Sequence, residues 1–304
     1  MTNDSRLVKT ADELTQDGFW LGEGNVFTKG DTKFLPLYEG KMAQMYDHRA
    51  AGIVVNPENL HRPAQEQPTS LEDHQNPALS PLPQFWVDAK HVRQAFTDEA
   101  PDWLVGYKDV TAPTNVRTMI PCAIPYSAVG NTFCLVDVRP TLKRALAVCL
   151  LANLSSFALD FATRQKVGGQ HLNFFIVEQL PVLPPEKYSE NWRGVVLEDF
   201  IVQRVLELCY TARDMRGFAE DLGYDGPPFA WDEERRLHLR CQLDALYFHL
   251  YGLTYDEAAD VLDTFPIVKR QDEERYNGRF RTKDLILGYY NAYAAGNMDA
   301  WVGE

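Results

Sequence analysis

ALAVCLLANLSSFALDFATRQKVGGQHLNFFIVEQLPVLPP, residues 145–185, is the stretch around which this chain is predicted to fold. Its first half carries apolar residues at three- and four-residue spacing, which predicts one long helix with a core-facing stripe. Gly168 and Gly169 are typical of a left-handed helix end. The aromatic and β-branched residues 174–177 predict a strand, and the prolines of 181–185 end the unit because proline cannot donate to a ladder. The predicted stripe comprises Leu146, Cys149, Leu150, Leu154, Phe157, Ala158 and Phe161.

Strands are predicted before this unit and helices after it. The strands cover 103–110, 119–126 and part of 127–138, and the helices cover 195–215, 232–252, 254–263 and 284–296. Thr254 and Glu257 have the spacing of a capping box, and Gly252 and Gly296 are positioned to end helices. The pattern predicts an α+β fold, with a small α/β lobe followed by a mostly α-helical C-terminal region.

Three segments are expected along the chain. Residues 1–84 are predicted to be an irregular N-terminal segment that includes an exposed, proline-rich insertion at 56–83. Residues 85–185 form the α/β lobe, and residues 186–304 form the helical region. At 304 residues, the chain is long enough for one large or two ordinary domains.

The net charge of −13 argues against nucleic acid as a partner, but the charge is unevenly distributed. Lys and Arg number nine against fifteen Asp and Glu in 1–99, and fourteen against twenty-three in 186–304. In 100–185 there are seven basic and five acidic residues. The central unit is therefore locally basic, and a binding face needs only local charge.

Cysteine and histidine usage predicts neither a disulfide framework nor a metal site. The five cysteines form no CxxC pair, and the seven histidines form no HxxxH or HExxH pair. Free thiols fit a reducing compartment. No apolar run reaches membrane-spanning length and no secretory signal is present, so a cytoplasmic protein with no membrane partner is expected.

The chain carries no recognised catalytic motif. GxGxxG after a strand, GxxxxGK[ST] and GxSxG are all missing. Asn56-Pro57-Glu58 lacks the second proline and the aromatic residue of the N-P-P-Y motif of adenine methylases, so it is rejected as a base-flipping site. No catalytic residue and no cofactor are therefore expected in this chain.

Two polar loops of the central unit are candidates for DNA contact. Asn, Gln and Arg can form paired hydrogen bonds with base edges, whereas Lys and the amides of glycine suit phosphate. The first loop offers Thr111, Thr114, Asn115 and Arg117, with Lys108 on the preceding strand. The second offers Arg164, Gln165, Lys166, Gly168, Gly169, Gln170, His171 and Asn173. The alternative is that both are ordinary polar turns with basic residues at a helix end.

Two further basic segments have open interpretations. The segment 269–283 either binds phosphate or forms an ionic surface that docks the last helices. Its candidate contacts are Lys269, Arg270, Arg279, Arg281 and Lys283. Lys41 and Arg49 either touch phosphate or are solvated charges beside a packed element.

Several stretches together resemble the C-terminal part of large bacterial DNA adenine methyltransferases of restriction–modification and phage-defence systems. The resemblance is nearest to type IIG restriction enzymes, which join nuclease, methylase and specificity regions in one chain. The specific pieces are LLANLSSFALDFATRQKVGGQHLNFFIVEQLPVLPP (150–185) and LDALYFHLYGLTYDEAADVLDTFPIVKRQDEERYNGRFRTKDLIL (243–287). MTNDSRLVKTADEL (1–14), LPLYEGKMAQMYDHR (35–49) and GYKDVTAPTNVRTMIPCAIP (106–125) follow family order.

The resemblance implies that the lobe 85–185 is similar to a target recognition domain, which reads DNA sequence. In the family these pieces follow the methyltransferase domain, so Met1 is expected to be internal to a longer chain or an alternative start. The parent enzyme would bind S-adenosylmethionine, and the partners of this region would be duplex DNA and the methyltransferase domain. The alternative is a standalone or truncated interaction protein that docks a defence-complex partner through its acidic helical half.

Overall fold

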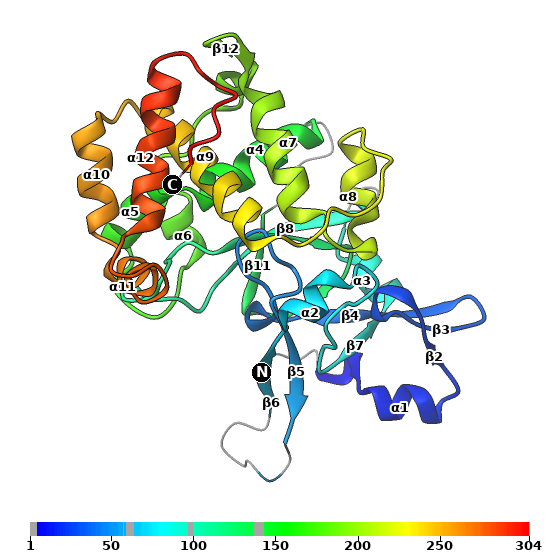
Figure 1. The fold of residues 1–304 in the computed structure, drawn as a ribbon. Helices are drawn as coiled ribbons and strands as arrows, with labels where there is room; N and C mark the ends of the chain where they lie inside the picture. The colour runs from blue at the N-terminus through cyan, green and yellow to red at the C-terminus, as the bar shows by residue number, and fades with distance from the viewer. Residues whose placement is uncertain (1–4, 57, 59–63, 97–99, 137–142, 304) are drawn as a thin grey trace. The chain divides into compact units, whose positions relative to one another are not determined.

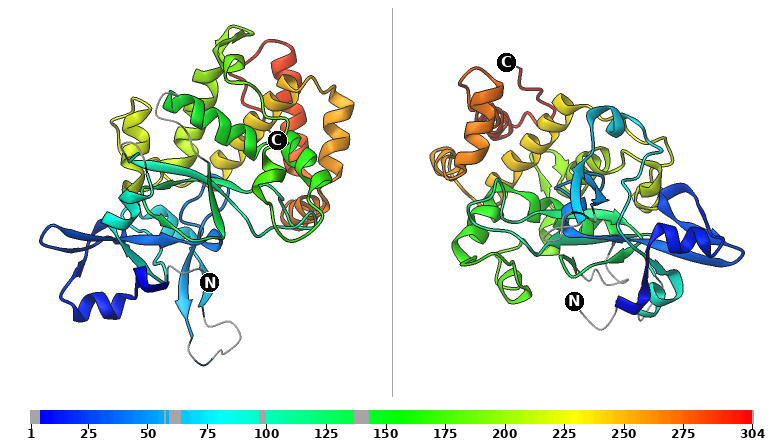
Figure 2. Two further views of the ribbon diagram at one scale, coloured as in Figure 1. Left: turned by 180° about the vertical axis from the view of Figure 1, so that it is seen from behind. Right: turned by 90° about the horizontal axis from the view of Figure 1, so that it is seen from below.

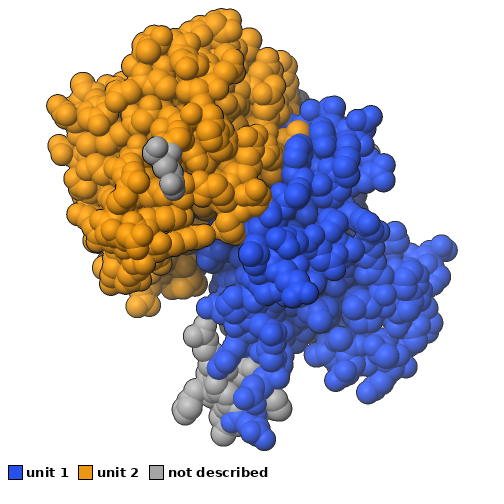
Figure 3. All heavy atoms as spheres, viewed as in Figure 1, with its two compact units in different colours: residues 1–109, 121–142, 209–231 blue, residues 110–120, 143–208, 232–304 orange. Residues whose placement is uncertain are grey.

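The computed structural model describes residues 5–56, 58, 64–96, 100–136 and 143–303. The chain divides into two compact units, each assembled from segments that are distant in sequence (Figure 3). Unit 1 comprises residues 1–109, 121–142 and 209–231, and unit 2 comprises residues 110–120, 143–208 and 232–304. These edges differ from the boundaries expected after residues 84 and 185, which stay a prediction about functional segments. Helices and mainly antiparallel sheets are both present, which confirms the predicted α+β class.

Unit 1 contains a six-stranded sheet with the order β1-β7-β4-β3-β2, in which β10 also pairs with β4. Its strands are β1 (Val8–Lys9), β2 (Trp20–Leu21), β3 (Phe27–Lys29), β4 (Thr32–Tyr38), β7 (Trp86–Asp88) and β10 (Ala128–Val129). Gly30 lies in the tight turn between β3 and β4 with φ 57°, a conformation that glycine adopts without strain. The expectation that residues 1–84 form an irregular segment is therefore wrong for β1 to β4. Most of these strands have only two or three residues, too few for a period-two pattern to be recognised.

A second, three-stranded antiparallel sheet with the order β11-β8-β9 confirms the strands predicted between residues 103 and 138. Its members are β8 (Trp103–Lys108), β9 (Pro121–Pro125) and β11 (Phe133–Val136). A Cβ added at Gly106 would approach the Phe133 ring to 2.3 Å, so the central strand requires glycine where this ring crosses it. The core beside this sheet includes Tyr38, Met42 and Ile124.

The proline-rich segment also contains regular structure. β5 (Ala51–Val55) and β6 (Ala64–Pro68) form a hairpin, and a capping box at Ser70 begins α2 (Leu71–Gln75). The expectation that 56–83 is an exposed, irregular insertion is therefore wrong in its irregularity for 64–68 and 71–75, although most of these residues are exposed. The other helices of unit 1 are α1 (Ala11–Gln16), α3 (Ala89–Gln94) and α8 (Arg216–Asp221), with 3-10 turns η1 (Ser5–Leu7), η2 (Glu23–Asn25), η3 (Gly40–Met42) and η5 (Arg213–Met215).

Unit 2 is mostly helical, and α9 packs along α12 within it (Figures 1 and 2). Its helices are α4 (Arg144–Ser155), α5 (Phe157–Lys166), α6 (Phe174–Val177), α7 (Leu197–Cys209, the last residue belonging to unit 1), α9 (Glu233–Leu250), α10 (Tyr255–Asp263), α11 (Pro266–Arg275) and α12 (Arg281–Ala294). The remaining elements are η4 (Pro185–Ser189), β12 (Asn191–Trp192) and β13 (Val195–Val196).

The four helices predicted after residue 185 are confirmed as α7, α9, α10 and α12, with shifts at their ends. The capping box of Thr254 and Glu257 is present. Gly252 and Gly296 have φ values of 72° and 84°, as expected for residues that end helices. Helix α7 ends at Cys209, six residues before the predicted end at 215.

The long helix predicted from residue 145 is broken in two. Helices α4 and α5 meet at Ser156 with a bend of 63°. Ser156 is extended, and its Oγ accepts the Leu159 amide at 3.2 Å, so it caps α5. Serine competes with helix continuation in this way, and the apolar spacing on either side did not reveal the break. Most of α4 is buried on several faces, which differs from the single stripe predicted.

The strand predicted at 174–177 is a single helical turn, α6. The amides of Ile176 and Val177 donate to the Asn173 carbonyl at 3.0 and 3.3 Å. Ile176 in this turn and Leu180, four residues later, are buried, whereas Phe174 and Phe175 are about three-fifths exposed. The glycine prediction is also wrong: α5 ends at Lys166, its C-cap Val167 is extended, and neither Gly168 nor Gly169 has a positive φ.

Within the described part of the chain, no single helix is long and apolar enough to cross a membrane. Helices α4 and α5 reach that length and composition only as a pair, which is bent.

Candidate nucleic-acid interface

The two polar loops predicted to contact DNA lie side by side in unit 2. An isolated antiparallel bridge joins Val110 to His171, and the Thr111 amide donates to the Gln170 carbonyl at 3.0 Å. These backbone contacts connect segments that are about sixty residues apart in the sequence. The sequence indicated each loop separately but not that they meet.

Arg164 connects the first loop to the residues that directly precede α11. Its Nη2 donates to the carbonyls of Asn115 and Val116 at 2.7 and 2.9 Å, and its Nη1 donates to the Thr264 carbonyl at 3.1 Å. The guanidinium carbon lies 3.9 Å from the centre of the Phe265 ring, and burial lowers the pKa of Arg164. Arg164 therefore has a structural role: it holds the start of α11 beside the first loop.

Arg117 is buried inside unit 2 instead of facing solvent. Its Nε donates to Asp160 Oδ2 at 2.6 Å, and its Nη2 donates to the Ser155 carbonyl at 2.6 Å. Its guanidinium also stacks on Phe157 at 3.9 Å. Only 7% of Arg117 is exposed, so its side chain cannot reach a base without unfolding this region. This removes Arg117 from the DNA-contact set.

Two other candidates of the first loop, Thr111 and Lys108, are also held by the fold and do not face solvent freely. Thr111 is buried, and its hydroxyl donates to the Thr118 carbonyl at 2.8 Å. Lys108 belongs to unit 1, where burial lowers its pKa. Neither residue presents an exposed group in the way that a base or phosphate contact requires.

The remaining loop candidates are exposed. They are Thr114, Asn115, Gln165, Lys166, Gly168, Gly169, Gln170, His171 and Asn173. Atoms added as Cβ at Gly168 and Gly169 would meet nothing within 4 Å, so a ligand backbone has room to approach there. The paired loops therefore present amides, one lysine and two open glycines on a rigid base.

The basic residues of 269–283 are divided between exposed and buried positions. Lys269 and Arg270 lie on α11 and face Glu273 and Glu274 at 3.9 and 4.0 Å. Arg281 is buried and forms an ion pair with Glu234. The two others pair with acids: Arg279 with Asp284 at 3.3 Å and Lys283 with Asp263 at 2.7 Å. These contacts favour the ionic-surface interpretation of the segment over phosphate binding.

Sequence reasoning missed two exposed aromatic side chains beside the second loop. Phe174 and Phe175 were assigned to a buried strand, but they are 59% and 61% exposed on α6. Val110 and Val116, on the first loop, are also exposed. The adjacent polar stretch 168–173 was the available signal, because a short aromatic pair directly after an exposed loop need not enter the core.

The phosphate hypothesis for Lys41 and Arg49 in unit 1 is not supported by their contacts. Arg49 is fully buried, and its guanidinium donates to the carbonyls of His74, Asn76 and Leu79. Lys41 lies 3.2 Å from a Glu39 carboxylate oxygen. Arg49 therefore connects loops by satisfying their carbonyls, as buried polar groups require.

A serine, an aspartate and a histidine also meet in unit 1, but without the geometry of a nucleophilic triad. Ser80 Oγ donates to Asp214 Oδ2 at 2.5 Å, and His48 Nε2 lies 2.9 Å from Asp214 Oδ1. Burial opposes ionisation of Asp214, but His48 and Ser80 outweigh it and lower the pKa of Asp214. Since the serine bonds to the carboxylate and not to the imidazole, no general base is placed to activate it.

Among the described residues, no group of three or more His, Cys, Asp or Glu side chains lies in a metal-binding arrangement. The chain matches no protein-family model, and no curated protein or solved structure was found to be similar to it.

Proposed function

We propose that unit 2 contacts duplex DNA through the paired loops 110–117 and 164–173. On this proposal the chain is the sequence-recognition module of a restriction–modification or phage-defence adenine DNA methyltransferase in the cytoplasm. It would position DNA for a catalytic domain outside this chain, and that domain would bind S-adenosylmethionine. The observation that carries the proposal is the backbone bridge between Val110 and His171, which brings exposed amides of two distant segments onto one surface.

The chemistry of the paired loops suits DNA. The exposed amides of Asn115 and Gln170 are of the type that bonds adenine edges. Lys166 supplies a phosphate contact, and Phe175 supplies an apolar contact to a thymine methyl group or a base step. Because Arg164 holds the carbonyls of Asn115 and Val116, little ordering of the first loop is needed on binding.

Selection from a pool of randomised duplexes tests this proposal. The chain is expected to enrich one sequence. Asn115→Ala is expected to relax the preference at one position by about 1–3 kcal/mol, whereas Lys166→Gln weakens all sequences alike. Asn297→Ala, which changes an exposed amide elsewhere in unit 2, is the matched control. Equal effects of the two asparagine substitutions would contradict the loop assignment.

A second candidate function is protein docking, as a standalone or truncated interaction protein that serves a defence complex. The charge balance of α11 favours it, because three basic residues there accompany three acidic ones. Such a helix offers little net attraction to phosphate. This function predicts that the chain enriches no duplex sequence and that charge changes on α11 alter assembly with a purified methyltransferase domain.

A further inference from the structure

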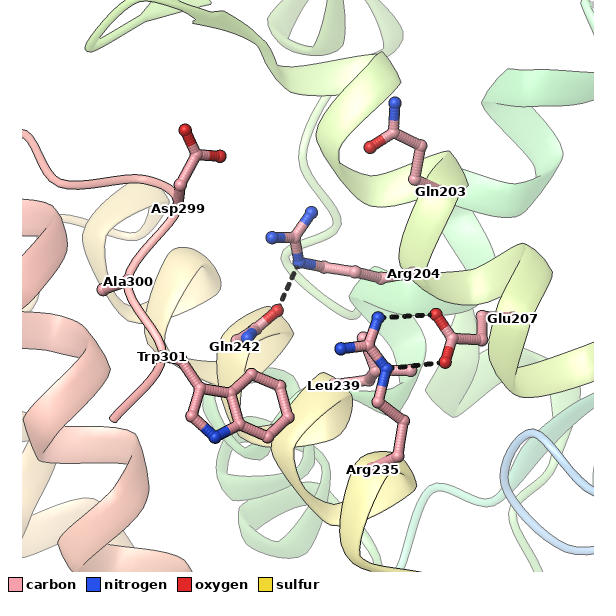
Figure 4. A pocket seen from close by; sticks show the side chains of 9 residues that line it. All are labelled: Gln203, Arg204, Glu207, Arg235, Leu239, Gln242, Asp299, Ala300 and Trp301. Carbon is pink, nitrogen blue, oxygen red and sulfur yellow. Dashed lines mark hydrogen bonds and ion pairs between the residues drawn. The ribbon is translucent and has the colours of Figure 1, made fainter. Parts of the chain in front are cut away.

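A pocket of about 250 Å³ lies between α7, α9 and the segment 299–301 in unit 2 (Figure 4). It is formed by elements other than the paired loops, so the proposed DNA contact does not use it. Among the groups that line it are the guanidinium of Arg204, the carboxylate of Asp299 and the indole of Trp301. Each contributes a different interaction to a small molecule.

Arg204 presents its guanidinium to this pocket from α7. Its Nε donates to Gln242 Oε1 at 2.7 Å, its Nη1 donates to the Phe200 carbonyl at 2.9 Å, and its guanidinium carbon lies 3.3 Å from the Phe200 ring centre. These contacts hold the fork in place. Among the described residues no carboxylate forms an ion pair with it, and burial lowers the pKa of Arg204. A held, partly buried guanidinium of this kind suits a ligand carboxylate.

Arg235, the other arginine at the pocket, is already neutralised. Its Nε and Nη2 donate to the two Glu207 oxygens at 2.7 and 2.8 Å, which is a bidentate pair. The Arg235–Glu207 pair therefore lines the pocket without adding net charge to it. The Trp301 ring stacks on His238, with ring centres 4.1 Å apart, yet half of its surface is exposed. This ring forms the apolar surface of the pocket together with Leu239 and Ala300.

Asp299 extends from the C-terminal segment on the other side of the opening from Arg204 (Figure 4). It is exposed, and its charge acts on Arg204 without an ion pair between the two. A simple anion that binds Arg204 is repelled by the negative charge of Asp299. A simple cation that binds Asp299 is repelled by the positive charge of Arg204. A molecule with both charges satisfies both groups.

We infer that this pocket binds a small zwitterion with a carboxylate, an ammonium group and an aromatic or apolar part, such as a free aromatic amino acid. The carboxylate bonds Arg204, the ammonium group faces Asp299, and the side chain contacts Trp301. The pocket volume limits the ligand to about this size, since pockets for drug-sized molecules begin at about 300 Å³.

Titration calorimetry of the full chain with L-phenylalanine tests this inference, with phenylacetate and phenethylamine as probes that each lack one charge. Phenylalanine is expected to bind at least about tenfold more tightly than either, a difference of about 1.4 kcal/mol. Asp299→Asn is expected to remove the preference over phenylacetate. Arg204→Gln is expected to abolish phenylalanine binding.

Asp260→Asn, an exposed acid on α10, is the control and is expected to change nothing. Arg204 also packs on Phe200, so the exposed Asp299 provides the test that does not depend on retained packing. The inference is overturned if phenylalanine shows no binding at millimolar concentration, if the three probes bind equally, or if Asp299→Asn leaves their order unchanged.

Discussion

Arg117→Met separates the structural account of this arginine from a role in DNA contact. The methionine keeps an apolar stem beside Phe157, but it removes the guanidinium that bonds Asp160. Asp160 is fully buried, and its carboxylate would then keep the amides of Thr118 and Met119, at 3.0 and 2.9 Å.

The magnitude follows from this geometry. Breaking a buried ion pair by removing one partner costs about 3–5 kcal/mol, because the other charge stays buried and uncompensated. That is a large fraction of the about 5–15 kcal/mol that stabilises a typical domain. It corresponds to between two and four orders of magnitude in the opening equilibrium that exposes the Thr118 and Met119 amides, at about 1.4 kcal/mol for each factor of ten.

Native-state hydrogen exchange by mass spectrometry over residues 110–120 and urea unfolding of the same protein measure this loss. Lys166→Met, an exposed change on α5, is the control and is expected to stay within about 0.5 kcal/mol of the original stability. The reasoning fails if Arg117→Met unfolds at the same urea concentration as the original chain. It fails equally if the variant loses duplex binding while its exchange rates are unchanged, because the guanidinium would then face DNA.

Three further predictions follow from single sites. Burial raises the pKa of Asp244 from 3.8 to about 6, so the folded chain holds this proton more tightly than the unfolded chain. Stability in urea should therefore fall by about 3 kcal/mol as pH rises from about 3 to about 7, and Asp244→Asn should flatten that profile. Thr254→Ala removes the hydroxyl that accepts the Glu257 amide and should cost about 1 kcal/mol of unfolding free energy, whereas full stability in Thr254→Ala and its loss in Thr254→Ser would contradict the cap. Phe175→Ser should change stability by less than about 0.5 kcal/mol, because the ring is exposed, yet weaken duplex binding in a fluorescence anisotropy titration; unchanged affinity would remove Phe175 from the interface.

The elements best predicted from the sequence are those whose ends carry local chemical signals. Helix α10 was placed by its Thr254 capping box, and Gly252 and Gly296 marked helix ends that the structure confirms. The strands β8, β9 and β11 were found because each is long enough for apolar and β-branched residues to stand out. In contrast, Ser156 divides two helices whose apolar spacing continues across it, and spacing alone does not distinguish a capped break from a continuous helix.

The sequence indicated the two polar loops of the candidate site, but neither their pairing nor the burial of Arg117. Arg117 and Arg281 look like basic surface residues in the sequence. In the structure each is buried and pairs with a carboxylate more than forty positions away. Such pairing is decided by tertiary packing, which local pattern does not contain. The same limit applies to Phe174 and Phe175, since their exposure depends on which residues of α6 face the rest of unit 2.

The most direct test of DNA contact by unit 2 is a duplex-binding titration of the full chain at several salt concentrations. The original chain is expected to bind duplex at low salt, and Lys166→Gln is expected to reduce the slope of log affinity against log salt by about 1. Lys90→Gln, an exposed lysine on α3 of unit 1, is expected to leave the slope unchanged. Absence of binding at low salt, or the same change of slope in both variants, would contradict DNA recognition by the paired loops.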